Sequence, residues 1–514
     1  MEVAATPPGA GIPRKAQRIA ALTGEKKKPA VSKAEDHPKA SITLSQALWH
    51  PSDLAVRPIM QNRKADQAAD VRFDGKTLPV DSLSSSEFLK LQPDELEAFV
   101  TRIMNSICGN TSVNEKMNTL KYLETICVSM DAANVFINGV LMHSLVKLLR
   151  TTKLPALRVQ LTSVIGLLVR HATLIEDDLA SSGIIAVLTE TLRDKQEKVR
   201  RCAMASLGEL LFYIATQNGG FDFLLFSYQV PSTTIALVAS ILRKGEDDVT
   251  QHYALKAIEN ISSQGGEWAA RFTTHDVLGN LCYIMKTSSK QEVVRSTAGS
   301  CLVRLVRFSP SSVAVVLEKV TFKELIAGLC KGGAKLQQVY INLLNIALVG
   351  SSVMNNASRH LQVLFDEKAL IPNIMAILEQ GPEVLRGKAF VCAALLCKIN
   401  RRWMLSFCNA KIVPAVERLT KEKDAYVQQC VDALIQIVVS LVPGILDSIG
   451  ADFQQSANSK RPSSATTTQH ATLGRSQPRG SMPLFPVVLH LFRSMTFRDR
   501  IVNSQVLQQL ATFL

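Results

Sequence analysis

The chain has 514 residues, of which 47% are hydrophobic and only 6% aromatic, and its formal net charge is +14. This length allows more than one ordinary domain, and the positive charge favours an acidic partner surface. The ten cysteines contain no Cys-x-x-Cys pair, so the sequence does not indicate a zinc site or a disulfide framework. We therefore expect no metal and no cofactor.

Residues 1–86 form a basic segment without helical periodicity, and we expect it to be mostly disordered. One stretch within it, residues 47–64, carries large apolar side chains that are costly to expose in a disordered tail. We interpret this stretch as a docking motif that binds either its own chain or another protein. The candidate docking residues are Trp49, His50, Pro51, Asp53, Pro58 and Ile59.

A helical pattern recurs between residue 87 and about residue 450. Its first apolar residue is repeated at steps of 42, 50, 45, 42, 49 and 42 residues, at Leu157, Val199, Val249, Val294, Leu336, Leu385 and Val427. The residues four and eight positions further on are apolar or small in every copy, and a shorter apolar helix is expected before each one. A period of about 40–47 residues with two or three helices is the signature of armadillo or HEAT repeats. We predict an all-α solenoid of armadillo/HEAT type, a right-handed superhelix of helical repeats with essentially no sheet.

The C-terminal part begins with a polar stretch. Residues 451–483 are rich in Ser, Thr and Pro and are expected to be a basic linker. The helical pattern returns at residues 484–514, and the chain stops within it, so we expect a further repeat that is cut short relative to a longer parent. The most apolar stretch, residues 431–449, is interrupted by Asp432, Gln436, Pro443 and Asp447, so no membrane span is expected.

Catalytic motifs are missing from the sequence. It has no phosphate-binding Gly-rich loop, no His-Glu-x-x-His, no Gly-x-Ser-x-Gly and none of the protein-kinase motifs. Aromatic residues do not alternate with basic ones as an RNA-binding sheet requires. We expect no enzyme, and nucleic acid is not the expected partner, although charge alone permits non-specific binding.

The docking motif followed by helical repeats resembles the Fused-like, unc-51-like kinase-related family. The stretch Leu48-Trp-His-Pro-Ser-Asp-Leu-Ala-Val-Arg-Pro-Ile-Met-Gln-Asn62 carries the resemblance, which covers the chain from about residue 48 onward. In that family a kinase-like domain precedes such a linker and an armadillo/HEAT region. The resemblance implies association with microtubules through the repeats and, for a plant member, a role in phragmoplast organisation and cell-plate formation. The implied location is the cytoplasm and the cytoskeleton.

Three functional hypotheses follow. The first is a non-catalytic scaffold that binds acidic tubulin through basic side chains, with candidate contacts at Arg200, Arg201, Lys244, Arg295, Arg386, Lys460 and Arg461. An Arg at the start of such a helix also commonly bridges loops instead. The second is a regulatory module in which the docking motif binds a kinase-like domain. The third, an importin-type cargo receptor, is disfavoured because Asn260 and Asn345 are isolated and the three tryptophans do not follow the repeat period.

Overall fold

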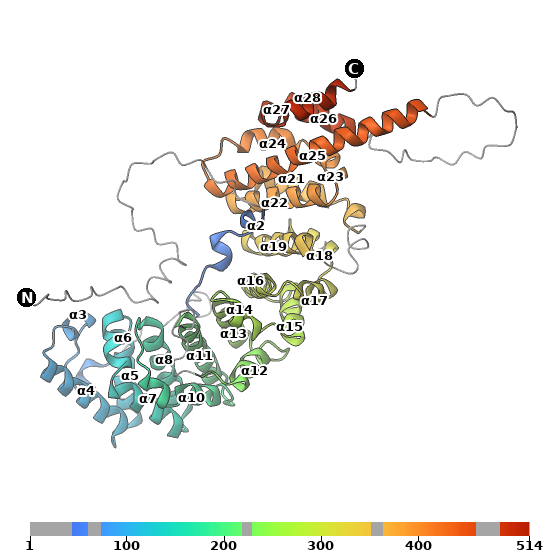
Figure 1. Cartoon of the computed structure of the whole chain (residues 1–514). Coiled ribbons are helices and arrows are strands. Elements are labelled where there is room, and N and C mark those ends of the chain that lie inside the picture. Colours follow the sequence, from blue (N-terminus) through green and yellow to red (C-terminus); the bar gives the residue numbers. More distant parts are fainter. Residues whose placement is uncertain (1–43, 60–72, 218–228, 351–362, 459–483, 513–514) are drawn as a thin grey trace, which may run out of the picture. The chain divides into compact units, whose positions relative to one another are not determined.

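The computed structural model describes residues 44–59, 73–217, 229–350, 363–458 and 484–512 (Figure 1). Every regular element in these ranges is a helix, which agrees with the predicted all-α class. The prediction of disorder falls mainly on residues 1–43 and 60–72, which lie outside the described residues, as do the candidate contacts Lys460 and Arg461.

Long helices recur at the predicted period. They are α5 (Val113–Ile126), α8 (Pro155–His171), α11 (Glu197–Gln217), α13 (Asp248–Ser262), α16 (Glu292–Phe308), α19 (Ala334–Gly350), α22 (Glu383–Ile399) and α25 (Ala425–Asn458). Successive long helices pack against one another from α5 to α16 and again from α19 to α25. The first apolar residue of each repeat and the residues four and eight positions further on are all buried in these helices, except Val249, which is half-buried. The pattern therefore marks the contacts between neighbouring repeats.

Each long helix follows another helix, which is the shorter of the two in every case except α4. These preceding helices are α4 (Pro93–Cys108), α7 (Val140–Thr151), α10 (Ile184–Thr191), α12 (Ser232–Ser240), α15 (His275–Lys286), α18 (Phe322–Gly328), α21 (Leu370–Gln380) and α24 (Ile412–Leu419). All of them except α12 pack on the long helix that follows. A third, short helix opens most repeats: α6 (Met130–Ile137), α9 (Asp178–Ser181), α14 (Gly266–Ala270), α17 (Ser312–Lys319) and α23 (Arg402–Asn409). Two or three helices per unit agree with the predicted armadillo/HEAT repeat.

Local sequence explains where several helices begin. Ser112 and Glu115 form a capping box at the start of α5, and Thr321 and Glu324 form another at α18. Such reciprocal bonds satisfy backbone N–H groups that have no partner within the helix. Asp247 caps α13 by accepting from the N–H groups of Val249 and Thr250.

The chain divides into two compact units, of which the first contains residues 51–315. It begins with the 3-10 helices η1 (Pro51–Leu54) and η2 (Gly75–Thr77) and with α3 (Ser85–Phe88). The prediction of a mostly disordered linker up to residue 86 is wrong for residues 73–86. The Tyr122 hydroxyl of α5 accepts from the Leu83 N–H at 2.7 Å, and the Tyr122 ring lies 5.1 Å from that of Phe73.

The second unit contains residues 34–50 and 316–514. Among its described elements are α2 (Leu44–Ala47) and, at the C-terminal end, α26 (Phe485–Arg493), α27 (Met495–Ile501) and α28 (Ser504–Ala511). Helix α25 continues to Asn458, past the linker boundary predicted at residue 450. By length and composition alone, residues 425–455 of α25 are able to cross a membrane, and α6 with α7 are a bent second candidate. The side chains of α25 pack on α22, α24 and α28, as those of a core helix do.

Candidate functional site

Residues 51–59 of the predicted docking motif lie on the long helices of the first unit. Only two side chains of this segment are buried, those of Asp53 (6% exposed) and Ile59 (0%). Pro51 is exposed within η1, and Pro58 is half-buried. The sequence left open whether the docking motif binds its own chain or another protein. For residues 51–59 the structure shows that the partner is the chain itself.

Four polar side chains of the long helices hold the main chain of residues 51–59. The Glu209 carboxylate accepts from the Ile59 N–H at 3.0 Å, and Lys256 Nζ donates to the Ile59 carbonyl at 3.0 Å and to the Pro58 carbonyl at 3.3 Å. Asn260 accepts from the Arg57 N–H at 3.3 Å and donates to the Arg57 carbonyl at 2.8 Å. The fourth side chain is that of Arg304 in α16. We call Glu209, Lys256, Asn260 and Arg304 the backbone-binding site.

Arg304 joins the segment to two repeats. Its guanidinium donates to the carbonyls of Asp53 and Ala55, at 3.1 and 2.9 Å, and to the carbonyl of Glu259 at 2.6 Å. It also pairs with the Glu259 carboxylate at 3.4 Å, although only 2% of the Arg304 side chain is exposed. A buried guanidinium is tolerated only when its donors are satisfied and its charge is balanced, and here the segment supplies two of the acceptors.

The side chain of Ile59 enters an apolar contact between α11 and α13. A Cβ at Gly208 would stand 2.6 Å from Ile59 Cδ1 and 2.8 Å from the Ala257 Cβ. Because such distances are below van der Waals contact, the glycine makes room both for Ile59 and for the neighbouring helix. The small residues of the repeat pattern thus admit this side chain.

His252 lies one helical turn before Lys256 on α13. Burial, and secondly the positive charge of Lys256, lowers the pKa of His252 to about 4. The imidazole is therefore neutral at physiological pH.

The preceding residues of the docking motif bind the second unit in a similar way. The Tyr426 hydroxyl of α25 donates to the Ala47 carbonyl at 3.0 Å, and the fully buried Lys388 Nζ donates to the Leu48 carbonyl at 3.3 Å. The His50 ring meets that of Tyr426 edge-on at 4.7 Å, and Trp49 is half-buried. In each unit, then, the motif is held largely through its carbonyl oxygens.

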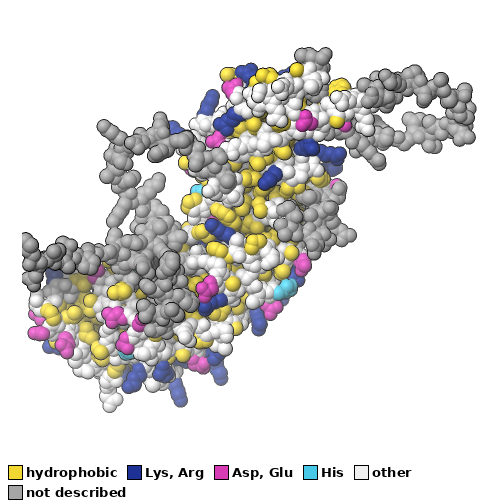
Figure 2. All heavy atoms as spheres, in the orientation of Figure 1, with side chains coloured by type: hydrophobic (Ala, Val, Ile, Leu, Met, Phe, Trp, Pro, Cys, Tyr) yellow, Lys and Arg dark blue, Asp and Glu magenta, His cyan; other side chains and the backbone are white. Residues whose placement is uncertain are grey.

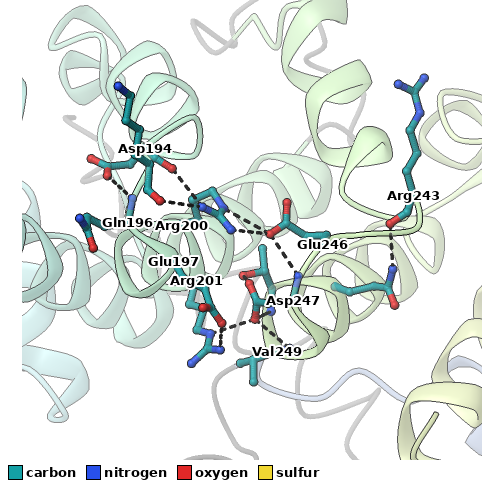
Figure 3. A network of polar contacts seen from close by, with 12 residues as sticks. Asp194, Gln196, Glu197, Arg200, Arg201, Arg243, Glu246, Asp247 and Val249 are labelled. Carbon is teal, nitrogen blue, oxygen red and sulfur yellow. Dashed lines mark hydrogen bonds and ion pairs between the residues drawn. The ribbon is translucent and has the colours of Figure 1, made fainter. Parts of the chain in front are cut away.

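A second feature of the first unit is a row of ion pairs between repeats. Arg158 of α8 pairs with Asp194 in the loop before α11, and Arg200 of α11 pairs with Glu246 at 2.8 Å in the loop before α13. Arg201 bonds to Asp247 at 2.9 Å, and Lys290 pairs with Asp248. Figure 3 shows Arg200 and Arg201 reaching from the start of α11 to Glu246 and Asp247 in the loop before α13. Because the loops are linked in succession, they form one edge of the first unit.

Asp247 is the most highly connected carboxylate of this edge. Burial alone would raise the pKa of Asp247, but hydrogen bonds from Thr250 and Arg201 together with the charge of Arg201 outweigh it and hold the pKa below its ordinary value. The carboxylate caps α13 and fixes the preceding repeat at the same time.

Most of the candidate acidic-partner contacts already bind groups within the chain. Arg200 and Arg201 make the ion pairs given above, Arg386 pairs with Glu422 at 2.6 Å, and Arg295 donates to the Met285 carbonyl at 2.9 Å. Of the described candidates, Lys244 is exposed and makes no ion pair with a described residue. Arg200, Arg201 and Arg386 thus bridge loops, the alternative role given above for an Arg at the start of such a helix. In each case the guanidinium reaches the acidic loop of a neighbouring repeat.

Lysines remain exposed along the same edge. Lys153, Lys195, Lys198 and Lys244 lie in the loops before α8, α11 and α13 or in the first turn of α11. Figure 2 shows Lys and Arg side chains in dark blue over the part of the first unit that carries α7 and α10. The acidic residues Asp194, Glu246 and Asp247 of these loops pair with arginines. We call Lys153, Lys195, Lys198 and Lys244 the basic edge.

The structure also bears on metal binding and thiol chemistry. Among the described residues no group of three His, Cys, Asp or Glu side chains is placed to hold a metal ion. Most of the cysteines are buried, as in Cys127, Cys301 and Cys392, and burial raises the pKa of each of these thiols.

Sequence reasoning missed the backbone-binding site. It noted Asn260 but disregarded it as isolated, and it did not single out Glu209, Lys256 or Arg304. The available signal was a charged or amide side chain among apolar residues on a helix with almost no polar face. Such a residue is rarely buried without a partner.

The repeats and their stacking define the class: the chain is an all-helical repeat protein of HEAT type. A crystal structure of an engineered protein shares the fold, with a TM-score of 0.52 and 15% identity over 69% of this chain and 82% of that one. Residues 445–514 match the family model described as serine/threonine-protein kinase ULK4-like, HEAT repeats.

Two named proteins are similar along almost the whole chain. Serine/threonine-protein kinase RUNKEL of Arabidopsis thaliana is 47% identical over 99% of this chain, and serine/threonine-protein kinase ULK4 of Mus musculus is 28% identical over 92%. The chain is related to RUNKEL and ULK4, as the family resemblance of the docking motif predicted. It spans 37% and 36% of the length of these relatives.

Proposed function

We propose that this chain is a non-catalytic scaffold that binds microtubules through the basic edge of its first unit. The observation that carries the proposal is the separation of charges along that edge. Arginines neutralise the acidic loop residues, and Lys153, Lys195, Lys198 and Lys244 remain exposed beside them. Further support comes from the net charge of +14 and from the resemblance to the kinase-related family.

Repetition along the chain makes such an edge suited to a polymer. The lysines are carried by consecutive repeats, so their charges are presented as a row to a partner whose acidic groups also recur. Attraction between exposed charges is screened over about 8 Å at physiological ionic strength. Binding is therefore expected to weaken steeply as salt is added. By the same resemblance, we propose a place on cytoplasmic microtubules and a role in phragmoplast organisation and cytokinesis.

Co-sedimentation of the full chain with microtubules across a salt series tests this function. We expect saturable binding at low salt that is progressively lost at higher salt. Duplex DNA and anionic vesicles are compared at equal charge concentration. Absence of saturable binding to microtubules at low salt would contradict the proposal, and equal binding to all three polyanions would replace it with non-specific attraction.

The alternative function, regulation of a protein kinase through the docking motif, is less well supported. The motif's buried side chains and many of its main-chain groups already contact its own repeats. A kinase-like domain would have to displace these contacts before it bound the same residues.

A further inference from the structure

We propose that the backbone-binding site of the first unit is a general site for peptides that form a 3-10 turn followed by a non-helical stretch, as residues 51–59 do in cis. The partner that fits it is a segment of another protein with an acidic residue and, six positions later, an aliphatic residue. This inference is independent of the basic edge and of microtubule binding.

The contacts themselves indicate exchangeability. Glu209, Lys256, Asn260 and Arg304 all bind N–H or carbonyl groups of the segment. Every peptide main chain carries these groups, so these contacts do not depend on the side chains of the ligand. Main-chain hydrogen bonds commonly supply affinity in this way, while pockets for individual side chains supply specificity.

Two side chains of the segment are buried. Ile59 is fully buried against Gly208 and Ala257. Asp53 is buried near Arg307: burial lowers the pKa of Arg307, and the negative charge of Asp53 partly opposes that effect. Arg57 is exposed, and the side chains between Asp53 and Arg57 are half-buried. The spacing of the two buried side chains defines the proposed ligand.

The site is also prepared for a ligand without the segment. The ion pair and the hydrogen bond from Arg304 to Glu259 lie within the repeats, so these two contacts of the guanidinium do not depend on the segment. Lys256 and Glu209 are carried by the stacked helices α13 and α11, which are held by their apolar faces. A preorganised site loses less free energy on binding than one that must first order its side chains.

Occupation in cis has a measurable consequence. A segment on the same chain acts at an effective concentration in the millimolar range. A free peptide therefore competes poorly with it until the segment is weakened. Residues 51–59 thus reserve the site for partners that bind more tightly or arrive at high local concentration.

The test uses the full chain and a fluorescein-labelled peptide with the sequence of residues 51–59. In one variant, residues 51–59 are replaced by a Gly/Ser stretch of equal length, and in a second variant only Ile59→Asp is made. We expect both variants to bind the peptide saturably by fluorescence anisotropy, and the wild-type chain to bind it at least tenfold more weakly.

Matched peptides and site variants make the assignment specific. Ile59→Asp or Asp53→Lys in the peptide should weaken binding at least tenfold, whereas Arg57→Ala should change it less than twofold, because that side chain is exposed. In the Gly/Ser chain, Asn260→Ala should weaken binding at least fivefold. Asn345→Ala is the control, since that buried asparagine donates to the Lys388 carbonyl of the second unit.

A third measurement needs no variant. In the wild-type chain, an excess of unlabelled peptide should speed amide hydrogen exchange at Arg57 and Ile59 by displacing the segment. The proposal is overturned if the folded variants do not bind the peptide at 100 µM, or bind the Ile59→Asp peptide equally well. If neither variant folds, the exchange measurement decides by itself. Unchanged amide hydrogen exchange at Arg57 and Ile59 of the wild-type chain with 1 mM peptide would then overturn the proposal.

Discussion

The helices of the first unit carry charged residues on two sides, and the two sets behave differently. On one side, Glu209, Lys256 and Arg304 are buried and bind the main chain of residues 51–59. On the other, Arg158, Arg200 and Arg201 join neighbouring loops, and lysines remain exposed beside them. Charge in this repeat protein is therefore first used to hold the chain together, and only the remainder is available to a partner.

The comparison predicts that a buried charge is worth more to stability than a charge at the edge. Arg304→Ala should lower the free energy of unfolding by about 3–5 kcal/mol, because it leaves Glu259 unbalanced and removes the donors of two segment carbonyls. Urea denaturation followed by circular dichroism measures this loss. Arg295→Ala is the matched control, and it should cost about 1 kcal/mol because it removes one hydrogen bond of a half-buried side chain. Equal losses of unfolding free energy in Arg304→Ala and Arg295→Ala would contradict the prediction that the buried charge contributes more.

Acid should act on the buried side through His252, whose pKa is lowered to about 4. The folded chain keeps this imidazole neutral, while the unfolded chain binds a proton below about pH 6.5. The free energy of unfolding should therefore fall by about 3 kcal/mol as the pH is lowered from 6.5 to 4, and then show no further change from this group. Urea titrations at several pH values measure how the free energy of unfolding changes with pH. This pH dependence should be weaker in His252→Gln. The exposed His275 provides the control, and His275→Gln should retain the wild-type slope.

At the edge, Asp247→Ala should cost about 1–2 kcal/mol, since it removes the cap of α13 as well as the bond to Arg201. The pKa of Asp247 is lowered in the folded chain, so its contribution is present at neutral pH and is lost as the pH falls through that lowered value. Thermal unfolding of the wild type and of Asp247→Asn should accordingly converge in strong acid. A difference that persists undiminished below pH 3 would show that the charge of Asp247 is not what stabilises the edge.

The repeat architecture was largely predictable, because each long helix must bury one apolar stripe against its neighbours. Leu161, Ala203 and Ala298 belong to that stripe, and all three are fully buried. The partners of polar residues were not predictable in the same way. Arg304 donates a hydrogen bond to Ala55, which lies 249 residues away in the sequence. No local sequence pattern relates the two residues. Likewise, nothing in the sequence around Arg200 identifies Glu246, in the next repeat, as its partner.

The basic edge is the part of the account that bears most directly on function. Reversing charge at Lys195, Lys198 and Lys244 together, each to Glu, should raise the microtubule concentration needed for half-maximal binding at least tenfold, or about 1.4 kcal/mol. The helical content should be unchanged, because these side chains are exposed.

The most direct measurement compares this triple variant with Lys76→Glu, Lys90→Glu and Lys368→Glu, which make the same change in net charge at exposed lysines elsewhere. Co-sedimentation of both full-length variants with microtubules is measured at one salt concentration. The account predicts a loss of at least tenfold for the edge variant and less than twofold for the control. Equal losses would mean that only net charge matters, and no loss in the edge variant would contradict the assignment of microtubule binding to this edge.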